Sequence, residues 1–356
     1  MKVGLILPSN IWFAPFVNIY IRVLEEHDIK YDIISWNKDG SENNVDFQFE
    51  QPIKIKGNLI KFWYYFQYAN FVKRKIKYYK YDKLIVFCPQ IAIFINGFLK
   101  KYYKGRYIFD YRDLSIEQKW YFKHPFLNVL KNSFANVISS PGFKRCLPNG
   151  FEYLLSHNFD INAVRKILNG EVGVSIQKQY EKINVLTIGG IRDYSSNIEV
   201  VKALANKDRI HLQFVGKGAA AGLIEDYAQS NEIRNIEFEG FYPKEKEAGY
   251  IQQASFLNIY YPRVITHDTA LSNRFYNALI YRKPMIVTTG TTQGDYVEKY
   301  QLGLSLETCD KLDTKLKNYL MTFDYDTFSK RCDELLLSFL EDYCIWENRV
   351  KMFLVN

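Results

Sequence analysis

The sequence has 356 residues, of which 47% are hydrophobic and 24% are charged, as expected for a folded globular protein of about two domains. This composition excludes a disordered chain, a collagen-like fibre and a small disulfide scaffold, although aromatic residues are abundant at 17%. The net charge of +8 is uneven, since residues 1–165 carry 24 basic and 14 acidic side chains whereas residues 166–356 carry 23 and 25.

Five widely spaced cysteines form no CxxC pair, which argues against a zinc knuckle or a redox motif and suits a reducing compartment. The first residues, MKVGLILPSN, lack the apolar core and cleavage site of a signal peptide. The longest apolar stretch, Leu84–Leu99, contains Pro89 and is shorter than the roughly 20 residues of a membrane span. We therefore expect a buried strand followed by a helix there, in a cytoplasmic protein.

The first half, residues 1–165, alternates apolar runs with helical stretches. A helix is expected around Asn18–Glu26. Strands are expected at Lys2–Pro8, Tyr31–Trp36, Lys83–Pro89, Arg106–Tyr111, Asn136–Ser140 and Tyr153–Asn158. This alternation indicates a parallel sheet with both faces covered.

Residues 53–83 form the most basic segment, with nine Lys/Arg and one acidic residue, Asp82, interleaved with Phe, Trp and Tyr. A basic and aromatic helix suits an anionic membrane surface. The same mixture also suits single-stranded nucleic acid, or a solvated helix whose aromatic residues pack inward. We favour the membrane over nucleic acid, and the inward-packed helix remains open.

The second half restarts the pattern over residues 166–325, after an expected linker at 161–182. Helices are expected around Asn197–Ala205, up to about Ser230, and from about Asp326 to the end. Strands are expected at Ile183–Gly190, His211–Gly218, Ile236–Phe241, Ser255–Tyr261 and Pro284–Thr289. The sequence therefore predicts two doubly wound, Rossmann-like α/β domains, with a ligand cleft at the carboxyl ends of their strands.

Two strand–helix turns of the second half are rich in glycine. Gly189, Gly190 and Arg192 follow one strand, and the run GKGAAAG follows the next. Glycine lets backbone N–H groups approach a phosphate, and a cation such as Arg192 or Lys217 would strengthen a diphosphate site. Tight packing of helix on sheet is an equally good explanation, and the spacing is a weak match to an NAD fingerprint.

The order of motifs across residues 183–306 resembles the donor-binding domain of GT-B glycosyltransferases of the bacterial group 1, or family 4, type. Four segments carry the resemblance: VLTIGGIRDYSSNIEVVKAL, LQFVGKG, NIEFEGFYPKEKEAGYIQQASFLNIYYP and ALSNRFYNALIYRKPMIVTTGTTQGDYVEKYQLGLSL. Looser matches in the first half are FDYRDLS, ANVISSPGFKRCL and YLLSHNFD. The resemblance implies an acceptor-binding domain at 1–165, a nucleotide-sugar-binding domain at 166–325, and C-terminal helices at 326–356 that pack back toward the first domain.

The resemblance implies transfer of a sugar from a nucleotide diphosphate sugar to a hydroxyl group, with retention of configuration and without a cofactor. The acceptor would be a polyprenyl-diphosphate-linked glycan in the synthesis of a capsule, exopolysaccharide or O-antigen. The enzyme would lie on the inner face of the plasma membrane, held there through residues 53–83. No HxxE, HExxH or plausibly placed DxD motif is found, so we expect no catalytic metal.

The resemblance also assigns candidate residues. Arg192 matches the arginine that faces the donor diphosphate, and Asp113 matches the end of the Arg/His-Asp motif, where it would orient a substrate or take up the acceptor proton. The expected catalytic residues are Asp113, Arg192 and Asp268. The expected donor-binding residues are Gly189, Gly190, Arg192, Gly216, Lys217, Gly240, Phe241, Asn273, Arg274 and Asn277. The expected acceptor-side residues are Asn10 and Arg112.

The sequence departs from the family at its paired glutamates. The first falls near Asp268 or Thr269, and the second falls on Asn277. An amide has one acceptor oxygen and grips two ribose hydroxyls less well than a carboxylate. A non-catalytic module that binds a nucleotide sugar or a partner protein is therefore the alternative function. A third interpretation, a GT-B-fold UDP-sugar epimerase, lacks support because the sequence does not show the expected acid and histidine constellation. Among the isolated histidines, His267 is the best candidate because it precedes Asp268.

Overall fold

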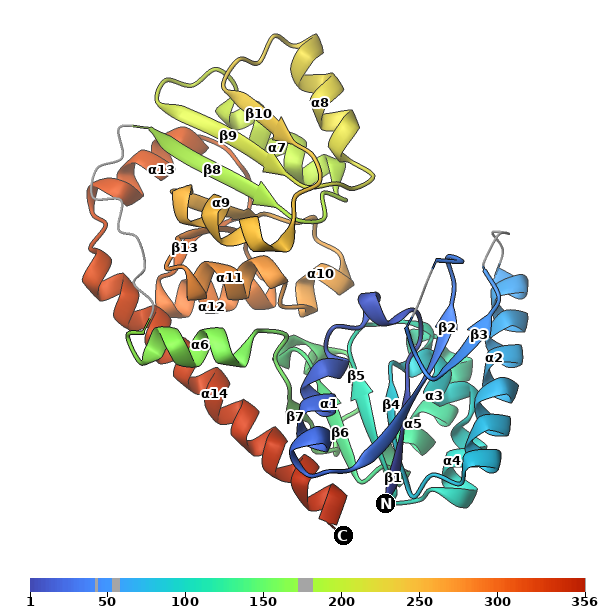
Figure 1. The fold of residues 1–356 in the computed structure, drawn as a ribbon. Helices are drawn as coiled ribbons and strands as arrows, with labels where there is room; N and C mark the ends of the chain where they lie inside the picture. Colours follow the sequence, from blue (N-terminus) through green and yellow to red (C-terminus); the bar gives the residue numbers. More distant parts are fainter. Residues whose placement is uncertain (42–43, 53–57, 172–181, 356) are drawn as a thin grey trace. The chain divides into compact units, whose positions relative to one another are not determined.

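The structure is a computed structural model that describes residues 1–41, 44–52, 58–171 and 182–355 (Figure 1). The chain divides into two compact units: residues 1–157 with 341–356, and residues 158–340. The long C-terminal helix α14 (Tyr325–Val355) therefore begins in the second unit and ends in the first. No helix in the described ranges is long and apolar enough to cross a membrane.

The first unit is built on a seven-stranded sheet in which all pairings are parallel. The strand order is β3-β2-β1-β4-β5-β6-β7. The strands are β1 (Lys2–Ile6), β2 (Lys30–Asn37), β3 (Phe47–Glu50), β4 (Lys83–Phe87), β5 (Tyr107–Tyr111), β6 (Ala135–Ile138) and β7 (Leu154–Leu155). The order reverses direction between β1 and β4, which is where doubly wound sheets open a ligand crevice.

Helices cover both faces of this sheet (Figure 1). The α-helices are α1 (Val17–Glu26), α2 (Asn58–Tyr79), α3 (Pro89–Phe94), α4 (Asn96–Tyr102) and α5 (Lys123–Asn132), and the short 3-10 helices are η1 (Ile11–Phe13), η2 (Ile116–Gln118), η3 (Trp120–Phe122) and η4 (Pro141–Arg145). Helices α2 to α5 share one core with the sheet. On the other side, Tyr20 of α1 packs its ring 4.9 Å from that of Trp346, near the end of α14.

The second unit repeats the architecture with six parallel strands in the order β10-β9-β8-β11-β12-β13. The strands are β8 (Ile183–Ile188), β9 (Ile210–Val215), β10 (Ile236–Glu239), β11 (Phe256–Ile259), β12 (Met285–Thr288) and β13 (Gly303–Leu306). The direction of the strand order reverses between β8 and β11.

Two buried clusters hold the helices of the second unit to its sheet. One cluster contains side chains of α6 (Ile161–Leu168), α9 (Glu247–Gln253), α11 (Asn273–Ile280), α12 (Thr292–Tyr300) and the start of α14. The other cluster contains side chains of α7 (Tyr194–Leu204), α8 (Ala221–Ser230) and α13 (Leu312–Met321). The remaining helices are η5 (Lys244–Lys246) and α10 (Ile265–Thr269). The predicted fold class, two doubly wound α/β domains, is confirmed.

The structure corrects the sequence-based elements in two places. Residues 161–168 were expected in a linker but form α6, because Asp160 caps its first N–H groups and Val164 is buried in the second unit. The rest of the expected linker, 172–181, lies outside the described residues. Strands β3 and β13 were not expected, since both are short edge strands whose residues are mostly only partly buried.

Candidate functional site

The point where the second sheet reverses its strand order gathers most of the expected donor-binding residues. Strands β8 and β11 are neighbours there, and the turns that follow them lie at the same edge because the strands are parallel. Ligands of doubly wound folds bind at such an edge. The carboxyl edge of this sheet is therefore the candidate functional site, hereafter the switch-point site.

The second glycine turn packs tightly on the first. A Cβ on Gly216 would lie 2.0 Å from the carbonyl oxygen of Gly189, and one on Gly218 would lie 2.0 Å from that of Ile191. Gly216 also has a φ of +133°, which side chains rarely allow. Gly216, an expected donor residue, is thus required by backbone packing, which was the alternative explanation for glycine in this turn.

The first turn is open. The nearest atom to a Cβ on Gly189 would be the Tyr242 hydroxyl at 3.9 Å, and the nearest to one on Gly190 would be Nε of Arg192 at 3.4 Å. Gly189 has a φ of +92°. The backbone between β8 and α7 therefore leaves room for the close approach of a ligand, with the Arg192 side chain beside it.

Arg274, on the first turn of α11, joins the two strands at the reversal. Its guanidinium donates to the backbone carbonyl oxygens of Ile188, of Asn258 at 3.2 Å and of Gly190 at 3.0 Å. The side chain is buried, and within the described residues no carboxylate forms an ion pair with it. Arg274 therefore clamps the ends of β8 and β11 and leaves an uncompensated positive charge at the switch-point site.

Two further cations lie at this edge. Arg192 is exposed, and its guanidinium makes no hydrogen bond or ion pair within the described part of the chain. Lys217 follows β9, and its ammonium lies 5.8 Å from the ring centre of Phe241, which follows β10. The Cε of Lys217 would lie 3.9 Å from a Cβ added to Gly240. The site thus offers cations from several successive turns, which suits a diphosphate.

Asp268, an expected catalytic residue, is engaged by a neighbour. Arg263 binds both its carboxylate oxygens, at 2.8 and 3.2 Å, and also donates to the carbonyl oxygen of Thr289 at 2.9 Å. Because Asp268 already accepts a forked guanidinium, it serves first to hold the turn after β11 against the turn after β12. Arg263 was not predicted from the sequence, although it lies only five residues before Asp268.

His267 and Asp193 also meet at the switch-point site. The histidine stacks on Tyr261 at 4.9 Å between ring centres, with an angle of 10°, and its Nε2 lies 3.4 Å from a carboxylate oxygen of Asp193. Asp193 precedes α7, so the pair connects the turns after β8 and β11. Only the fold brings these residues together, and the sequence analysis did not select Tyr261 or Asp193.

Asn273 and Asn277 lie one helical turn apart on α11. The Asn273 side-chain oxygen accepts a hydrogen bond from Asn158 at 2.8 Å. Asn277 is half-buried, and its amide has no hydrogen-bond partner among the described residues. Asn277 lies three residues after Arg274 and four after Asn273, so it neighbours each of them along the helix surface. Asn277 therefore stays available to a ligand, as one amide rather than a carboxylate.

The two expected acceptor-side residues, Asn10 and Arg112, belong to the first unit, and both are buried. Asn10 donates to Asn37 at 2.9 Å and to Asp39 at 3.0 Å, and so ties the turn after β1 to the turn after β2. The Arg112 guanidinium binds Asp110 at 2.7 Å and the Ser156 carbonyl oxygen at 2.9 Å. These contacts hold the turns at the sheet edge in place.

Asp110 is the centre of a buried network that explains why Arg112 is internal. It accepts a hydrogen bond from Tyr20 at 2.7 Å, and Tyr20 in turn accepts one from Trp346 at 3.1 Å. Burial, followed by the Asp110 charge, raises the pKa of Tyr20 well above its usual value. The end of α14 is thereby fixed to the first unit. Asp113, by contrast, is exposed in the loop after β5, at the carboxyl edge of its sheet.

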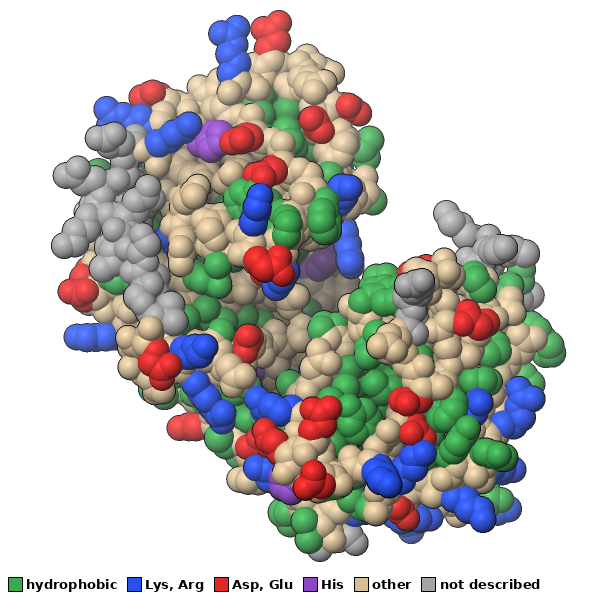
Figure 2. Space-filling view, viewed as in Figure 1, with side chains coloured by type: hydrophobic (Ala, Val, Ile, Leu, Met, Phe, Trp, Pro, Cys, Tyr) green, Lys and Arg blue, Asp and Glu red, His purple; other side chains and the backbone are tan. Residues whose placement is uncertain are grey.

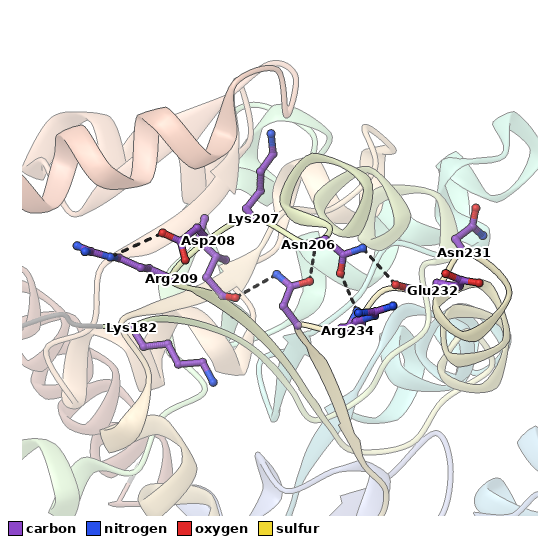
Figure 3. A pocket seen from close by; sticks show the side chains of 10 residues that line it. Lys182, Asn206, Lys207, Asp208, Arg209, Asn231, Glu232 and Arg234 are labelled. Atoms are coloured by element: carbon purple, nitrogen blue, oxygen red, sulfur yellow. Dashed lines mark hydrogen bonds and ion pairs between the residues drawn. The ribbon is translucent and has the colours of Figure 1, made fainter.

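A large cavity of about 910 Å³ lies at the opposite, amino edge of the second sheet (Figure 3). Asn206 lies at its centre and bonds the backbone of Arg234 and Glu232. The side chains of Lys182, Lys207 and Arg209 point in different directions (Figure 3). Because these cations do not converge, the cavity is a weaker candidate than the switch-point site. Within the described ranges no group of three or more His, Cys, Asp and Glu residues could hold a metal ion.

Known structures resemble the chain throughout, whereas no family model and no curated protein sequence matches it. Sucrose-phosphate synthase from Thermosynechococcus elongatus has 15% identity, with 100% of each chain covered and a TM-score of 0.71. Anabaena HepE in complex with UDP has 12% identity, 100% of each chain and a TM-score of 0.64. WaaG, a glycosyltransferase involved in lipopolysaccharide biosynthesis, has 13% identity over 99% of this chain and 94% of its own, with a TM-score of 0.54. At such low identity these likenesses show the fold, and the chain therefore has the two-domain α/β fold of GT-B glycosyltransferases.

Proposed function

We propose that this chain is a glycosyltransferase that transfers a sugar from a nucleotide diphosphate sugar to a hydroxyl group. The observation that carries the proposal is the pair of guanidinium groups, Arg192 and Arg274, beside the open turn at Gly189 and Gly190. Neither guanidinium has a carboxylate partner among the described residues. Cations without counter-ions beside open backbone N–H groups favour an anion with several charges.

The chemistry of sugar transfer suits this arrangement. As the bond to the sugar breaks, negative charge develops on the leaving diphosphate. Fixed positive groups stabilise that charge without reorganisation during the reaction. We infer that Arg192 contacts the diphosphate directly and that Arg274 adds its charge while holding the turn in place. In this proposal the two arginines compensate the charge, so transfer is independent of added metal. Retention of configuration is part of the proposal on the family resemblance alone.

The structural neighbours suggest which nucleotides to test first. Anabaena HepE was solved with UDP and with UDP-glucose, and the catalytic domain of starch synthase IV from Arabidopsis thaliana with ADP and acarbose. A thermal-shift screen with UDP, ADP, GDP, TDP and CMP would identify the base. A nucleotide at 100 times its Kd stabilises the protein by about 2.7 kcal/mol.

A matched pair of variants makes this screen specific to the switch-point site. Arg192→Ala removes the exposed guanidinium next to the open turn and should sharply reduce the shift. Arg209→Ala removes an equally exposed guanidinium at the opposite edge of the same sheet and should leave it unchanged. A shift that survives Arg192→Ala and disappears in Arg209→Ala would place the nucleotide in the amino-edge cavity and contradict the proposal.

For the acceptor, we propose a polyprenyl-diphosphate-linked glycan used in surface polysaccharide synthesis, with Asp113 orienting a substrate or taking up the acceptor proton. Its position at the carboxyl edge of the first sheet supports this role. An acceptor carried on a lipid requires the enzyme to reach a membrane surface, which the first unit is equipped to do.

Exposed aromatic side chains form a continuous surface on the first unit. This aromatic surface consists of Phe62, Trp63 and Phe66 of α2 and Trp120 and Tyr121 of η3. Ring contacts connect its two parts through Phe94 and Phe122, with centres 5.0 Å apart from Phe62 to Phe94 and 6.2 Å apart from Phe94 to Phe122. Trp120 is 85% exposed and Trp63 is 56% exposed, an unusual state for tryptophan in a soluble monomer.

The charge around the aromatic surface suits anionic lipid. Lys61, Lys119 and Lys123 are all exposed beside its residues in the sequence. Figure 2 shows both basic and hydrophobic side chains on the side of the first unit where α2 lies. Further along α2, Tyr68, Val72 and Ile76 pack inward. The inward-packed interpretation thus holds for the core-facing side of α2, and the membrane interpretation is proposed for the exposed side. Residues 53–57 of the predicted basic segment lie outside the described residues.

Vesicle sedimentation would test this surface. The protein should bind vesicles of phosphatidylglycerol and phosphatidylcholine more strongly than vesicles of phosphatidylcholine alone. Trp63→Ser combined with Trp120→Ser should abolish that binding, whereas Tyr78→Ser, which alters an exposed aromatic residue near the other end of α2, should not. Equal binding by both variants would remove the membrane from the proposal.

The alternative is a non-catalytic module that binds a nucleotide sugar, and Asn277 is the observation that favours it. Its unpartnered amide lies where the resembling family has a carboxylate. Glycosyltransferases commonly release some free sugar from the donor in the absence of acceptor, because water can replace the hydroxyl nucleophile. Slow hydrolysis of UDP-sugars that depends on Arg192 would support the enzyme, and tight binding with no hydrolysis would support the module.

A further inference from the structure

Lys38 is a half-buried cation with no carboxylate partner in the described part of the chain. It follows β2 directly, at the carboxyl edge of the first sheet, and its ammonium lies 4.6 Å from the ring centre of Trp36 and 5.0 Å from that of Tyr65. It donates one hydrogen bond, to the Tyr65 hydroxyl at 3.1 Å. Within the described residues no acidic side chain forms an ion pair with Lys38, although Asp39 is next to it in sequence and bonds Asn10 and Ser41 instead.

The surroundings of Lys38 add positive charge. Burial, together with a smaller contribution from Lys61, lowers the pKa of Lys38 to about 8. The Tyr65 hydroxyl accepts from Lys38, so its own O–H remains able to donate, and no acceptor for it is present among the described residues. Lys61 precedes Tyr65 by four residues on α2, so the two side chains share a helix face. Among the described residues, the Lys38 ammonium and the Tyr65 hydroxyl keep unused hydrogen-bonding capacity. A desolvated cation without a counter-ion is costly, and an anionic ligand would offset that cost.

The position of Lys38 connects it with the other candidate of the first unit. Cys88 follows β4 and is buried, and burial raises the pKa of its thiol. Asp113 raises that pKa further and Lys38 lowers it, so both charged groups lie within electrostatic reach of Cys88. In the strand order, β1 and β4 lie between β2, which Lys38 follows, and β5, which precedes Asp113. The two residues therefore flank the same stretch of the carboxyl edge, where doubly wound sheets bind ligands.

We propose that Lys38, with Lys61 and Tyr65, binds a phosphate-class anion at the carboxyl edge of the first unit. This inference deepens the proposed function and rests on it, because the anion would belong to the acceptor and would place the acceptor hydroxyl near Asp113. Ammonium and hydroxyl groups donate to phosphate oxygens without demanding one orientation. The anion can come from a diphosphate carried on a lipid or from a soluble phosphorylated acceptor, and the two sources share this chemistry.

Competitive acetylation of lysines, read by mass spectrometry at pH 8, tests the site. An amine with a pKa of about 8 is half unprotonated there, and an anion that raises this pKa to about 9 lowers the reactive fraction about fivefold. Inorganic pyrophosphate and farnesyl diphosphate are the two probes. Lys283 is the internal control, since burial also lowers its pKa to about 8 but its ammonium donates to the carbonyl oxygen of Gln252.

We expect either probe to slow acetylation of Lys38 about fivefold and to leave Lys283 unchanged. Protection by both probes identifies a free diphosphate as sufficient, and protection by farnesyl diphosphate alone identifies the lipid-carried form. Tyr65→Phe should weaken the protection. Lys75→Met should not, although Lys75 also lies over aromatic rings of the same unit, 4.4 Å from the ring centre of Phe47.

Absence of protection by both probes would overturn the inference, as would protection that disappears in Arg192→Ala, because the effect would then come from the donor side. The proposed function fails separately, if no nucleotide binds while Lys38 is still protected. A Lys38 that merely stabilises the aromatic rings around it would show the same acetylation rate with and without the probes.

Discussion

Replacing Arg274 by methionine should cost both stability and nucleotide binding, whereas the same change at Arg192 should cost binding alone. The two arginines lie at one site but are held differently. Arg274 is buried and donates to three backbone carbonyl oxygens at the ends of β8 and β11. Arg192 is exposed and forms no such bond within the described residues.

The size of the effect follows from those three contacts. A hydrogen bond from a charged group contributes roughly 1.5–3 kcal/mol. Methionine removes all three bonds but also removes the cost of burying a charge, which is several kcal/mol in a real protein. We therefore expect Arg274→Met to lower the free energy of unfolding by about 3 kcal/mol, equivalent to roughly 6–12 °C in Tm for a unit of this size. Arg192→Met should stay within about 0.5 kcal/mol of the wild type.

Thermal unfolding followed by circular dichroism measures the first effect, and calorimetric titration with the nucleotide selected by the thermal-shift screen measures the second. Each variant should weaken nucleotide binding by roughly 10- to 100-fold, the equivalent of one lost charge-assisted contact. If Arg274→Met were as stable as the wild type, Arg274 would not hold the ends of β8 and β11 together. Equal destabilisation by both variants would refute the distinction between a buried and a free guanidinium.

Three further predictions concern stability. Burial outweighs the effect of a neighbouring carboxylate and lowers the pKa of His157, so this side chain stays neutral in the folded state at pH values where the unfolded state takes up a proton. The free energy of unfolding should therefore fall by up to about 1.4 kcal/mol per pH unit below about pH 6.5. Urea unfolding at several pH values measures this fall, which should be shallower in His157→Gln. Asp110→Asn leaves the Arg112 guanidinium buried without its counter-ion and should destabilise by about 3–5 kcal/mol in the same assay, and an unchanged midpoint would contradict the buried network. Gly216→Ala would set a methyl group 2.0 Å from a backbone oxygen at a positive φ, so its yield of folded protein should collapse, whereas Gly222→Ala, which meets no atom within 4 Å, should express normally.

The sequence predicted the parts of the fold that depend on local pattern. Apolar runs such as Ile183–Ile188 are buried on both faces of a parallel sheet, and this burial makes them recognisable. The glycines after them also pointed to the correct edge of the second sheet. Strand β13 (Gly303–Leu306) was missed because an edge strand is buried on fewer sides and carries a weaker pattern.

The candidate site was less predictable, because its roles depend on contacts between distant residues. Nothing local distinguishes Arg274, which is a clamp, from Arg192, which is free; the difference arises when α11 packs against the ends of β8 and β11. The pairing of His267 with Asp193 likewise spans 74 positions and exists only once the sheet has formed. Lys38 was not singled out because its aromatic surroundings come partly from α2.

Hydrogen–deuterium exchange with and without saturating nucleotide shows at which edge of the second sheet the nucleotide binds, because it reports on both edges in one measurement. We expect slower exchange in the turns at 189–193 and 216–218 and at the start of α11, with no change around the amino-edge cavity at 206–210 and 231–235. Protection confined to the cavity residues would place the nucleotide at the opposite edge of the sheet and refute binding at the switch-point site.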